Sequence, residues 1–224
     1  FFALHVAALP LVLIFLVVAH ILALHEVGSN NPDGIEIKKN KGPDGIPLDG
    51  IPFHPYYTVK DIYGLGVFLI LLAAVVFFAP EMGGLFLEAA NFEPANPLLT
   101  PEHIAPVWYF TPYYAMLRAV PAFAGTQIWG VLVMFAAILL LFFVPWLDRA
   151  PVSSIRYRGP LYRIALILFA ASFIMLGYCG LMPAVQPFKA LSVIGTAYYF
   201  AFFLLMPWYT RIDSHKPEPP RVRS

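Results

Sequence analysis

The chain has 224 residues, of which 60% are hydrophobic and 12% are charged, and its formal net charge is +1. This composition is typical of an integral membrane protein and excludes an ordinary soluble domain. A net charge near zero gives no general attraction to nucleic acid, so we expect no nucleic-acid partner. The single cysteine, Cys179, can form no internal disulfide and belongs to no cysteine-based metal or cofactor motif.

Five apolar runs are close to the length that crosses a bilayer, about 20 residues of helix. Because backbone polar groups in lipid must be hydrogen-bonded internally, we expect each run to be a helix. The sequence therefore predicts an all-α fold, a polytopic helical membrane bundle with about five transmembrane helices. The runs are Phe1–Leu24, Ile62–Ala79, Ile128–Leu147, Ile164–Leu181 and Leu191–Trp208.

Lysine and arginine residues are distributed unequally among the connections between these runs. The first and third connections and the C-terminal tail carry twelve of the 14, whereas the second and fourth carry Arg118 and Lys189 alone. By the positive-inside rule, the first and third connections and the tail face the cytoplasm. The proline-rich tail at 209–224 contains no apolar run, so we expect it to be a disordered cytoplasmic end.

Two histidines lie near the ends of the first apolar run. His5 and His20 are 15 residues apart, which is roughly 22 Å along a helix and about 60° around it. An ionisable residue in a membrane helix usually faces a partner or a cofactor, and neutral imidazole is a common ligand of haem iron. Each histidine could therefore supply one axial ligand to a different haem. The alternative is a pair of buried histidines hydrogen-bonded to neighbouring helices.

The segment after this run supports a family resemblance. Residues 25–32 read HEVGSNNP, and with the preceding helix they resemble the fourth transmembrane helix of cytochrome b, the haem and quinone subunit of bacterial cytochrome bc complexes (respiratory complex III). The resemblance implies that His5 ligates the periplasmic-side haem and His20 the cytoplasmic-side haem. Their spacing is longer than is usual in the respiratory family and looks like the photosynthetic b–f branch. A kink at Pro10 could absorb the extra residue.

The resemblance implies a quinone-reduction site on the cytoplasmic side. In the family, residues that match His25, Ser29, Lys60 and Asp61 surround that site. An imidazole and a carboxylate there are suitable groups for delivering protons to a reduced quinone. We expect Asp61 to lie at the start of the second helix, where the helix dipole favours a negative charge. The alternative is a solvated Lys–Asp pair at a helix start.

The long second connection carries the most specific match. Cytochrome b has a PEWY motif here, which lines the quinol-oxidation site, and this chain reads Pro106-Val107-Trp108-Tyr109. Tyr114 and Arg118 follow at the offsets that the family shows. Val107 replaces a glutamate that is often assigned a part in binding quinol or carrying its proton away, so that role is vacant or is filled elsewhere, for example by Glu102. The alternative is an aromatic belt at the membrane surface.

The resemblance implies three regions in the chain. Residues 1–25 form a transmembrane helix with haem-ligand histidines, and residues 26–61 form a cytoplasmic loop with the quinone-reduction site. Residues 62–224 form the C-terminal domain of cytochrome b, with four transmembrane helices, the quinol-oxidation loop at 80–125 and the cytoplasmic tail. The chain would thus be the C-terminal part of a cytochrome b. It begins without Met and directly in a span, so we expect a fragment or a processed piece that is inactive alone.

The implied activity is that of a quinol–cytochrome c oxidoreductase in a bacterial inner membrane. Quinol is oxidised on the periplasmic side, electrons cross through two b-type haems, and ubiquinone is reduced on the cytoplasmic side, coupled to proton translocation. The implied partners are the missing N-terminal part of cytochrome b, a Rieske iron–sulfur protein, a c-type cytochrome, membrane lipid and a second copy in a homodimeric complex.

Three other interpretations remain open. In a split b–f-type complex the C-terminal helices form a separate subunit, but the division falls after the His-bearing helix, which this chain contains. A small solute transporter that uses membrane-embedded histidines would need polar residues in several helices, and the last three runs have almost none. A haem-free structural anchor would show no b-type haem in a visible spectrum.

Overall fold

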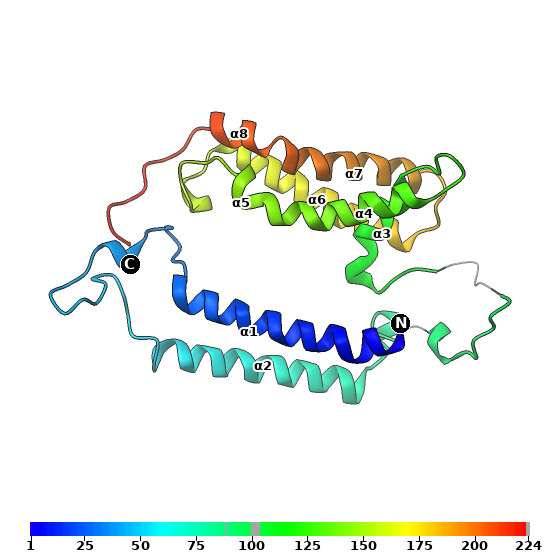
Figure 1. The fold of residues 1–224 in the computed structure, drawn as a ribbon, viewed down its shortest axis with the longest axis horizontal. Helices are drawn as coiled ribbons and strands as arrows, with labels where there is room; N and C mark the ends of the chain where they lie inside the picture. Colours follow the sequence, from blue (N-terminus) through cyan, green and yellow to red (C-terminus); the bar gives the residue numbers. More distant parts are fainter. Residues whose placement is uncertain (88, 100–103, 223–224) are drawn as a thin grey trace. The chain divides into compact units, whose positions relative to one another are not determined.

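The structure is a computed structural model that describes residues 1–87, 89–99 and 104–222, with Ala89 and Ala90 described by their backbone alone. Within this part of the chain the regular elements are helices, which confirms the predicted all-α class (Figure 1). The α-helices are α1 (Leu9–Val27), α2 (Tyr56–Phe78), α3 (Thr111–Ala119), α4 (Ile128–Leu140), α5 (Val144–Leu147), α6 (Pro160–Leu181), α7 (Phe188–Leu204) and α8 (Met206–Ile212). The shorter elements are the π-helix η1 (Leu4–Ala8) and the 3-10 helices η2 (Ile37–Lys39), η3 (Met82–Gly84), η4 (Ala89–Phe92), η5 (Trp108–Phe110), η6 (Leu141–Phe143) and η7 (Ile155–Tyr157).

The chain divides into two compact units, and each is described by itself. The first unit consists of Phe1–Gly50, Val152–Tyr157 and Pro217–Ser224. The second unit consists of Ile51–Pro151 and Arg158–Lys216. The division separates α1 and the loop after it from α2 and all later α-helices.

The expected number of spans is confirmed. Among the described residues, four helical segments are long and apolar enough to cross a membrane, and five if α7 and α8 count as one bent span. The four are Leu4–Val27, Tyr56–Phe78, Ile128–Leu147 and Pro160–Leu181. The bend of 59° between α7 and α8 has a local cause. Pro207, at the start of α8, has no N–H to donate to the carbonyl of Phe203.

Two spans begin earlier than their apolar runs predict. α2 starts at Tyr56 rather than Ile62, and α6 starts at Pro160 rather than Ile164. Proline suits the first helical turn because its fixed φ is already helical and its missing N–H would be unpaired there. The next N–H groups of α6 are capped by a residue far along the sequence: the Asp213 carboxylate accepts from Leu161 N at 3.2 Å and from Tyr162 N at 3.0 Å.

The expectation of a disordered tail is wrong for the residues up to 222. Beyond α8, the Asp213 carboxylate caps α6, as described above, and Glu218 Oε1 accepts from Ser153 N at 2.9 Å. Arg221 Nη2 donates to Asp49 Oδ1 at 2.6 Å. Composition alone predicts disorder here, but these bonds to residues far away in the sequence hold the tail in place.

The buried core of the second unit lies between α3, α4, α6 and α7. The Phe169 ring stacks on Phe202 with ring centroids 4.4 Å apart and meets Phe203 edge-on at 5.3 Å. Such pairs add about 0.5–1.5 kcal/mol each beyond the area they bury. The buried Tyr199 hydroxyl donates to the Ala137 carbonyl at 3.0 Å, so the phenol is satisfied within the core. Cys179 is a buried free thiol in this core, which fits a packing role.

Glycines let α6 approach both α3 and α7 closely. A Cβ added to Gly180 would lie 2.1 Å from the Thr111 carbonyl oxygen, and one added to Gly195 would lie 2.9 Å from Leu176 Cγ. Glycine at these two positions therefore permits the helices to pack closely.

We therefore expect Gly180→Ala to destabilise the second unit by about 1–3 kcal/mol, because the new methyl group must push α3 away. Thermal unfolding of the detergent-solubilised protein measures this as a lower Tm. The matched control is Gly177→Ala on the same helix, where the added Cβ meets nothing closer than 3.6 Å. That change should be neutral or slightly stabilising. Equal Tm values for the two variants would contradict the close approach.

Candidate functional sites

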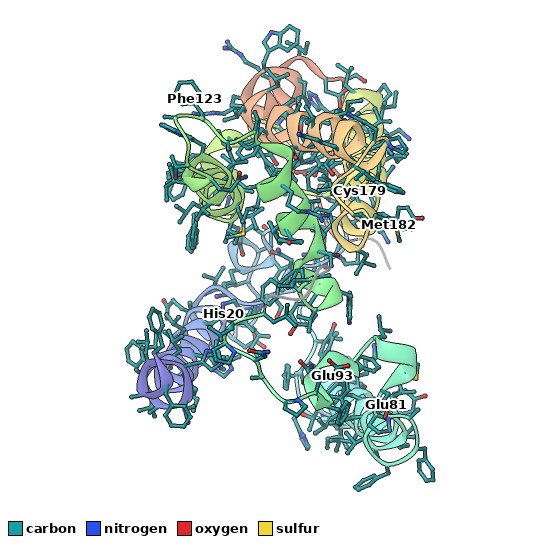
Figure 2. All side chains as sticks on the ribbon, turned by 90° about the vertical axis from the view of Figure 1, so that its right-hand side faces the viewer. His20, Glu81, Glu93, Phe123, Cys179 and Met182 are labelled. Atoms are coloured by element: carbon teal, nitrogen blue, oxygen red, sulfur yellow. The ribbon has the colours of Figure 1, made fainter. Side chains whose placement is uncertain are left out.

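His5 and His20 lie on one helical segment, η1 followed by α1. No residue of this segment is buried, so both imidazoles are exposed (Figure 2 labels His20). The described residues contain no group of three or more His, Cys, Asp or Glu side chains that could hold a metal ion. This donor set fits single axial ligands on one helix, each completed from elsewhere, rather than a self-contained metal site.

A π-helical segment contains His5 and ends shortly before Pro10. The segment η1 spans Leu4–Ala8, and Pro10 is the second residue of α1, which follows it directly. Pro10 has no N–H, so the Val6 carbonyl loses its usual α-helical donor. A π-turn pairs each N–H with the fifth residue before it and so takes up more residues per turn than an α-turn. The long spacing between His5 and His20 therefore contains a local widening of the helix next to Pro10.

The end of α1 is fixed by a residue from the following loop. His25 lies in the last turn of α1, and Gly28 ends the helix with a φ of 90°, a conformation that favours glycine. Lys38 Nζ donates to the Glu26 carbonyl at 2.7 Å. A lysine there satisfies a carbonyl that the helix leaves unpaired and complements the negative end of its dipole. His25 and Ser29 are exposed on either side of this helix end.

An ion pair holds a later part of the same loop. Arg221 Nε and Nη2 donate to Asp49 Oδ1 at 3.0 and 2.6 Å. These hydrogen bonds, with the positive charge of the guanidinium, hold the pKa of Asp49 below its ordinary value. A carboxylate whose pKa is lowered by folding stabilises the fold above its unfolded pKa and loses that contribution as the pH falls through the lowered value. The tail is therefore attached by this pair at neutral pH.

Lys60 and Asp61 lie further into α2 than we expected. Because α2 begins at Tyr56, its first turn contains no acidic residue, and Asp61 belongs to the second turn. The helix dipole acts mainly within the first turn, so it contributes little at Asp61. Asp61 is exposed, and Lys60 Nζ lies 5.5 Å from the centre of the Tyr57 ring. The prediction that Asp61 starts the helix is therefore wrong.

The residues expected around the quinone-reduction site are divided between the two units. His25 and Ser29 belong to the first unit, and Lys60 and Asp61 belong to the second. The structure thus places each pair on its own element, His25 and Ser29 at the end of α1 and Lys60 and Asp61 on α2.

The aromatic motif of the second connection leads directly into α3. Trp108 and Tyr109 form the turn η5, and the Thr111 hydroxyl donates to the Trp108 carbonyl at 2.6 Å. The two rings meet edge to face at 5.4 Å and are 50% and 55% exposed. Pro106 and Val107 before them are half-buried. The motif therefore offers aromatic surface from a short, hydrogen-bonded turn. Glu102 lies outside the described residues.

The segment that carries the motif is anchored to the bundle by α3. One face of α3 is buried at Thr111, Pro112, Ala115, Met116 and Ala119, with the spacing of successive helical turns. Its carbonyl end is capped, because Gln127 Nε2 donates to the carbonyls of Leu117 and Val120 at 3.2 and 3.0 Å. Tyr114 lies on the same helix, and its ring centre is 4.5 Å from the guanidinium carbon of Arg118.

Arg118 has a structural role that the sequence did not reveal. Its Nη2 donates to the carbonyls of Cys179, Gly180 and Met182 at 2.7, 3.2 and 2.9 Å. These groups form the end of α6, where Figure 2 labels Cys179 and Met182. Helix-end carbonyls lack partners within the helix, so the guanidinium caps α6 and ties α3 to it. The only sequence signal for this role was an isolated cation in an otherwise cation-poor connection.

We expect Arg118→Leu to lower the free energy of unfolding by about 2–3 kcal/mol, because helix-end carbonyls lose a charged donor. The measurement is thermal unfolding in detergent. Lys189→Ala is the control, since Lys189 is the exposed cation of the fourth connection. If both variants unfold at the temperature of the unsubstituted protein, Arg118 does not act as a tie between α3 and α6.

The fold and these sites define a polytopic helical membrane protein with a histidine pair on one span and an aromatic turn ahead of α3. Comparison with known proteins gives the family. Residues 1–112 match the family model described as cytochrome b (N-terminal)/b6/petB, and residues 94–200 match cytochrome b (C-terminal)/b6/petD. The chain belongs to the cytochrome b family.

Similar proteins include cytochromes b from several bacteria. The cytochrome b of Allochromatium vinosum is 60% identical over 100% of this chain and 55% of its own length. That of Rhodospirillum rubrum is 46% identical over 100% of this chain and 52% of its own length. A solved structure titled "Hyperthermophilic respiratory Complex III" is 39% identical, with a TM-score of 0.81 over 95% of this chain and 51% of that chain. The chain thus spans about half the length of these relatives.

The family matches correct one prediction. Because residues 1–112 match the N-terminal family model, the interpretation of the chain as the C-terminal part alone is wrong. The two matches overlap in residues 94–112, the segment that contains the aromatic motif. A single chain therefore joins regions that the two family models describe separately.

Proposed function

We propose that this chain contributes haem ligands and quinone-binding residues to the cytochrome b of a quinol–cytochrome c oxidoreductase, respiratory complex III. The observation that carries the proposal is the placement of His5 and His20 on one exposed, apolar helical segment of a chain that belongs to the cytochrome b family. His5 would hold one b-type haem through its imidazole, and His20 would hold a second. Residues outside this sequence would complete both sites. Each haem, when bound, supplies a one-electron carrier.

The bias of positive charge sets the orientation in this proposal. The connections rich in Lys and Arg, with the tail, lie on the cytoplasmic side of a bacterial inner membrane. His20 and His25 are then near the cytoplasmic side, and His5 is near the periplasmic side. The partners are a Rieske iron–sulfur protein and a c-type cytochrome on the periplasmic side, with membrane lipid around a homodimeric complex.

Quinol oxidation takes place at the aromatic motif. Trp108 and Tyr109 offer half-exposed rings, Pro106 shapes the turn before them, and Tyr114 continues the aromatic surface on α3. These groups bind and orient a quinol head group through apolar contact and phenol hydroxyls. Val107 contributes apolar contact only, so the proton that leaves the quinol passes to water or to another carboxylate. The proposal therefore implies turnover without a carboxylate at position 107.

Quinone reduction takes place on the cytoplasmic side. One quinone takes up two electrons and two protons to give one quinol. His25 and Asp61 hydrogen-bond the quinone carbonyls and donate these protons, directly or through water. Ser29 adds a hydroxyl donor, and the Lys60 ammonium offsets negative charge on the partly reduced quinone. Protons taken up here and released on the opposite side couple electron transfer to proton translocation.

The histidine assignment predicts separable losses. His20→Ala should remove the signal of the cytoplasmic-side haem from the complex and leave the other largely in place, and His5→Ala should do the converse. Visible difference spectra of the purified complex, with stepwise reduction, measure each signal. His54→Ala is the control, because His54 is exposed in the connection just before α2 and has no ligand role in this proposal. It should keep both signals.

Retention of both haem signals in either ligand variant would refute the assignment. The same spectra distinguish the other interpretations of the sequence. A transporter or a structural anchor would contain no b-type haem in the unsubstituted complex.

The role of Asp61 has its own test. Asp61→Asn keeps the size of the side chain but cannot deliver a proton. Quinol should still reduce the cytoplasmic-side haem at the usual rate, whereas the rate at which added quinone reoxidises that haem should fall at least tenfold. Rapid-mixing spectroscopy follows the absorbance of that haem. Asp44→Asn, in an exposed turn of the first connection, is the matched control and should leave reoxidation unchanged. Unchanged reoxidation in Asp61→Asn would return Asp61 to a solvated charge on α2.

A further inference from the structure

A buried carboxylate lies directly after the HEVGSNNP segment. Asp33 is 1% exposed, and a charged group is buried at little cost only when it is paired and hydrogen-bonded. The Tyr157 hydroxyl donates to Asp33 Oδ1 at 2.7 Å, and Arg156 Nη1 donates to the same oxygen at 3.2 Å. Both partners come from η7 in the third connection, more than 120 residues further along the chain. Asp33 is thus a long-range anchor within the first unit.

The backbone on either side of Asp33 is fixed as well. Asn31 Oδ1 accepts from the N–H groups of Asp33 and Ile35 at 3.2 and 3.1 Å, and Asn31 Nδ2 donates to the Ile35 carbonyl at 2.7 Å. The Ser154 hydroxyl donates to the Pro32 carbonyl at 2.6 Å. Residues 31–35 therefore form a hydrogen-bonded turn that is held against the third connection.

The loop at Gly34 packs tightly against Ser153 and Ser154 of the third connection. A Cβ added to Gly34, which has a φ of 72°, would lie 3.0 Å from both Ser153 Cβ and Ser154 N. A glycine is required there by its positive φ and by the lack of space. The packing leaves the loop little room to shift relative to the third connection.

The segment between the helix end and Asp33 is consequently held at both of its ends. At one end Lys38 caps the Glu26 carbonyl, and Gly28 N donates to the Leu24 carbonyl at 2.7 Å. At the other end, Asp33 is held by its hydrogen bonds to Tyr157 and Arg156. The short stretch between them contains Ser29, and His25 lies in the last helical turn before it.

We propose that Asp33, held by Tyr157 and Arg156, is a positioning residue for the cytoplasmic quinone site, because it fixes the loop that presents Ser29 beside His25. This inference rests on the proposed function. Asp33 does not touch the quinone; it restricts the conformations of the segment that does. A group held in place before the ligand arrives loses less entropy on binding, and a displacement of about 1 Å can cost a hundredfold in rate.

The test uses the purified, haem-loaded complex with Asp33→Asn, which removes the charge at nearly constant shape, and with Tyr157→Phe, which removes the shorter hydrogen bond. Reoxidation of the cytoplasmic-side haem is measured as a function of quinone concentration. We expect the KM for quinone to rise on the order of tenfold in Asp33→Asn and less in Tyr157→Phe. The reduction of the haems by quinol at the other site should stay within about twofold, because that site does not use this loop.

A second measurement is independent of turnover. Amide hydrogen exchange of residues 28–35 should become faster in both variants, since the anchor of the loop is weakened. The matched control is Asp49→Asn, which breaks the other ion pair of the same connection, between Asp49 and Arg221. It should accelerate exchange near residue 49 and leave the KM for quinone unchanged.

The outcomes separate this inference from the proposed function. Faster exchange of residues 28–35 with an unchanged KM would overturn the positioning role and leave Asp33 as a structural anchor only. If Asp33→Asn does not assemble, an unchanged KM in Tyr157→Phe overturns the proposal and a raised one supports it. If quinone fails to reoxidise the haem in the unsubstituted complex, the proposed function itself fails, and the exchange data still report whether Asp33 holds the loop.

Discussion

The constraint on which this structure depends is that backbone polar groups away from water must find partners within the protein. Within a span the α-helix meets this requirement by itself, so apolar composition is enough to form it. The helix ends do not, because their last N–H and carbonyl groups have no partner in the helix. In this chain several of those groups are satisfied by side chains from other elements. Arg118 caps the end of α6, Asp213 caps its beginning, Gln127 caps α3 and Lys38 caps α1.

These caps lie beside the candidate sites. The Arg118 cap joins α6 to the helix that follows the aromatic motif, so the same side chain that completes one helix also fixes the segment of Trp108 and Tyr109. The Lys38 cap stands at the end of α1, between His25 and Ser29. In both places a charged residue restricts the conformational freedom of the segment that carries the candidate side chains.

The spans could be predicted from the sequence because the length of an apolar run alone decides whether it crosses a bilayer. The residues at which α2 and α6 begin could not be predicted in this way. Lys60, Asp61 and Arg163 are polar and read as connection, whereas α2 and α6 include them, α6 with a cap from Asp213. The order of the tail was missed for the same reason, since composition does not show that Arg221 will meet Asp49. Contacts between residues far apart in sequence are set by the fold and are not visible in any local window.

The candidate sites divide in the same way. The histidine pair and the PVWY motif could be proposed as sites from the sequence, because each is a local pattern of residue type and spacing that resembles the family. Asp33 could not, because an aspartate after Asn-Pro is typical of an exposed turn, and its partner Tyr157 is 124 residues away. Its burial alone marks it as more than a turn residue.

The helix cap formed by Arg118 also explains an exception in the distribution of Lys and Arg along the chain. In the proposed orientation, Arg118 and Lys189 are the only Lys or Arg residues of the periplasmic connections, the side on which positive charge is disfavoured during insertion. Lys189 is exposed, whereas Arg118 donates to three carbonyls at the end of α6. Lysine would be a poor substitute at position 118, because its ammonium lacks the planar guanidinium that lies over the Tyr114 ring, 4.5 Å from the ring centre. An arginine on the disfavoured side is therefore explained by a structural requirement that arises only after the helices have packed.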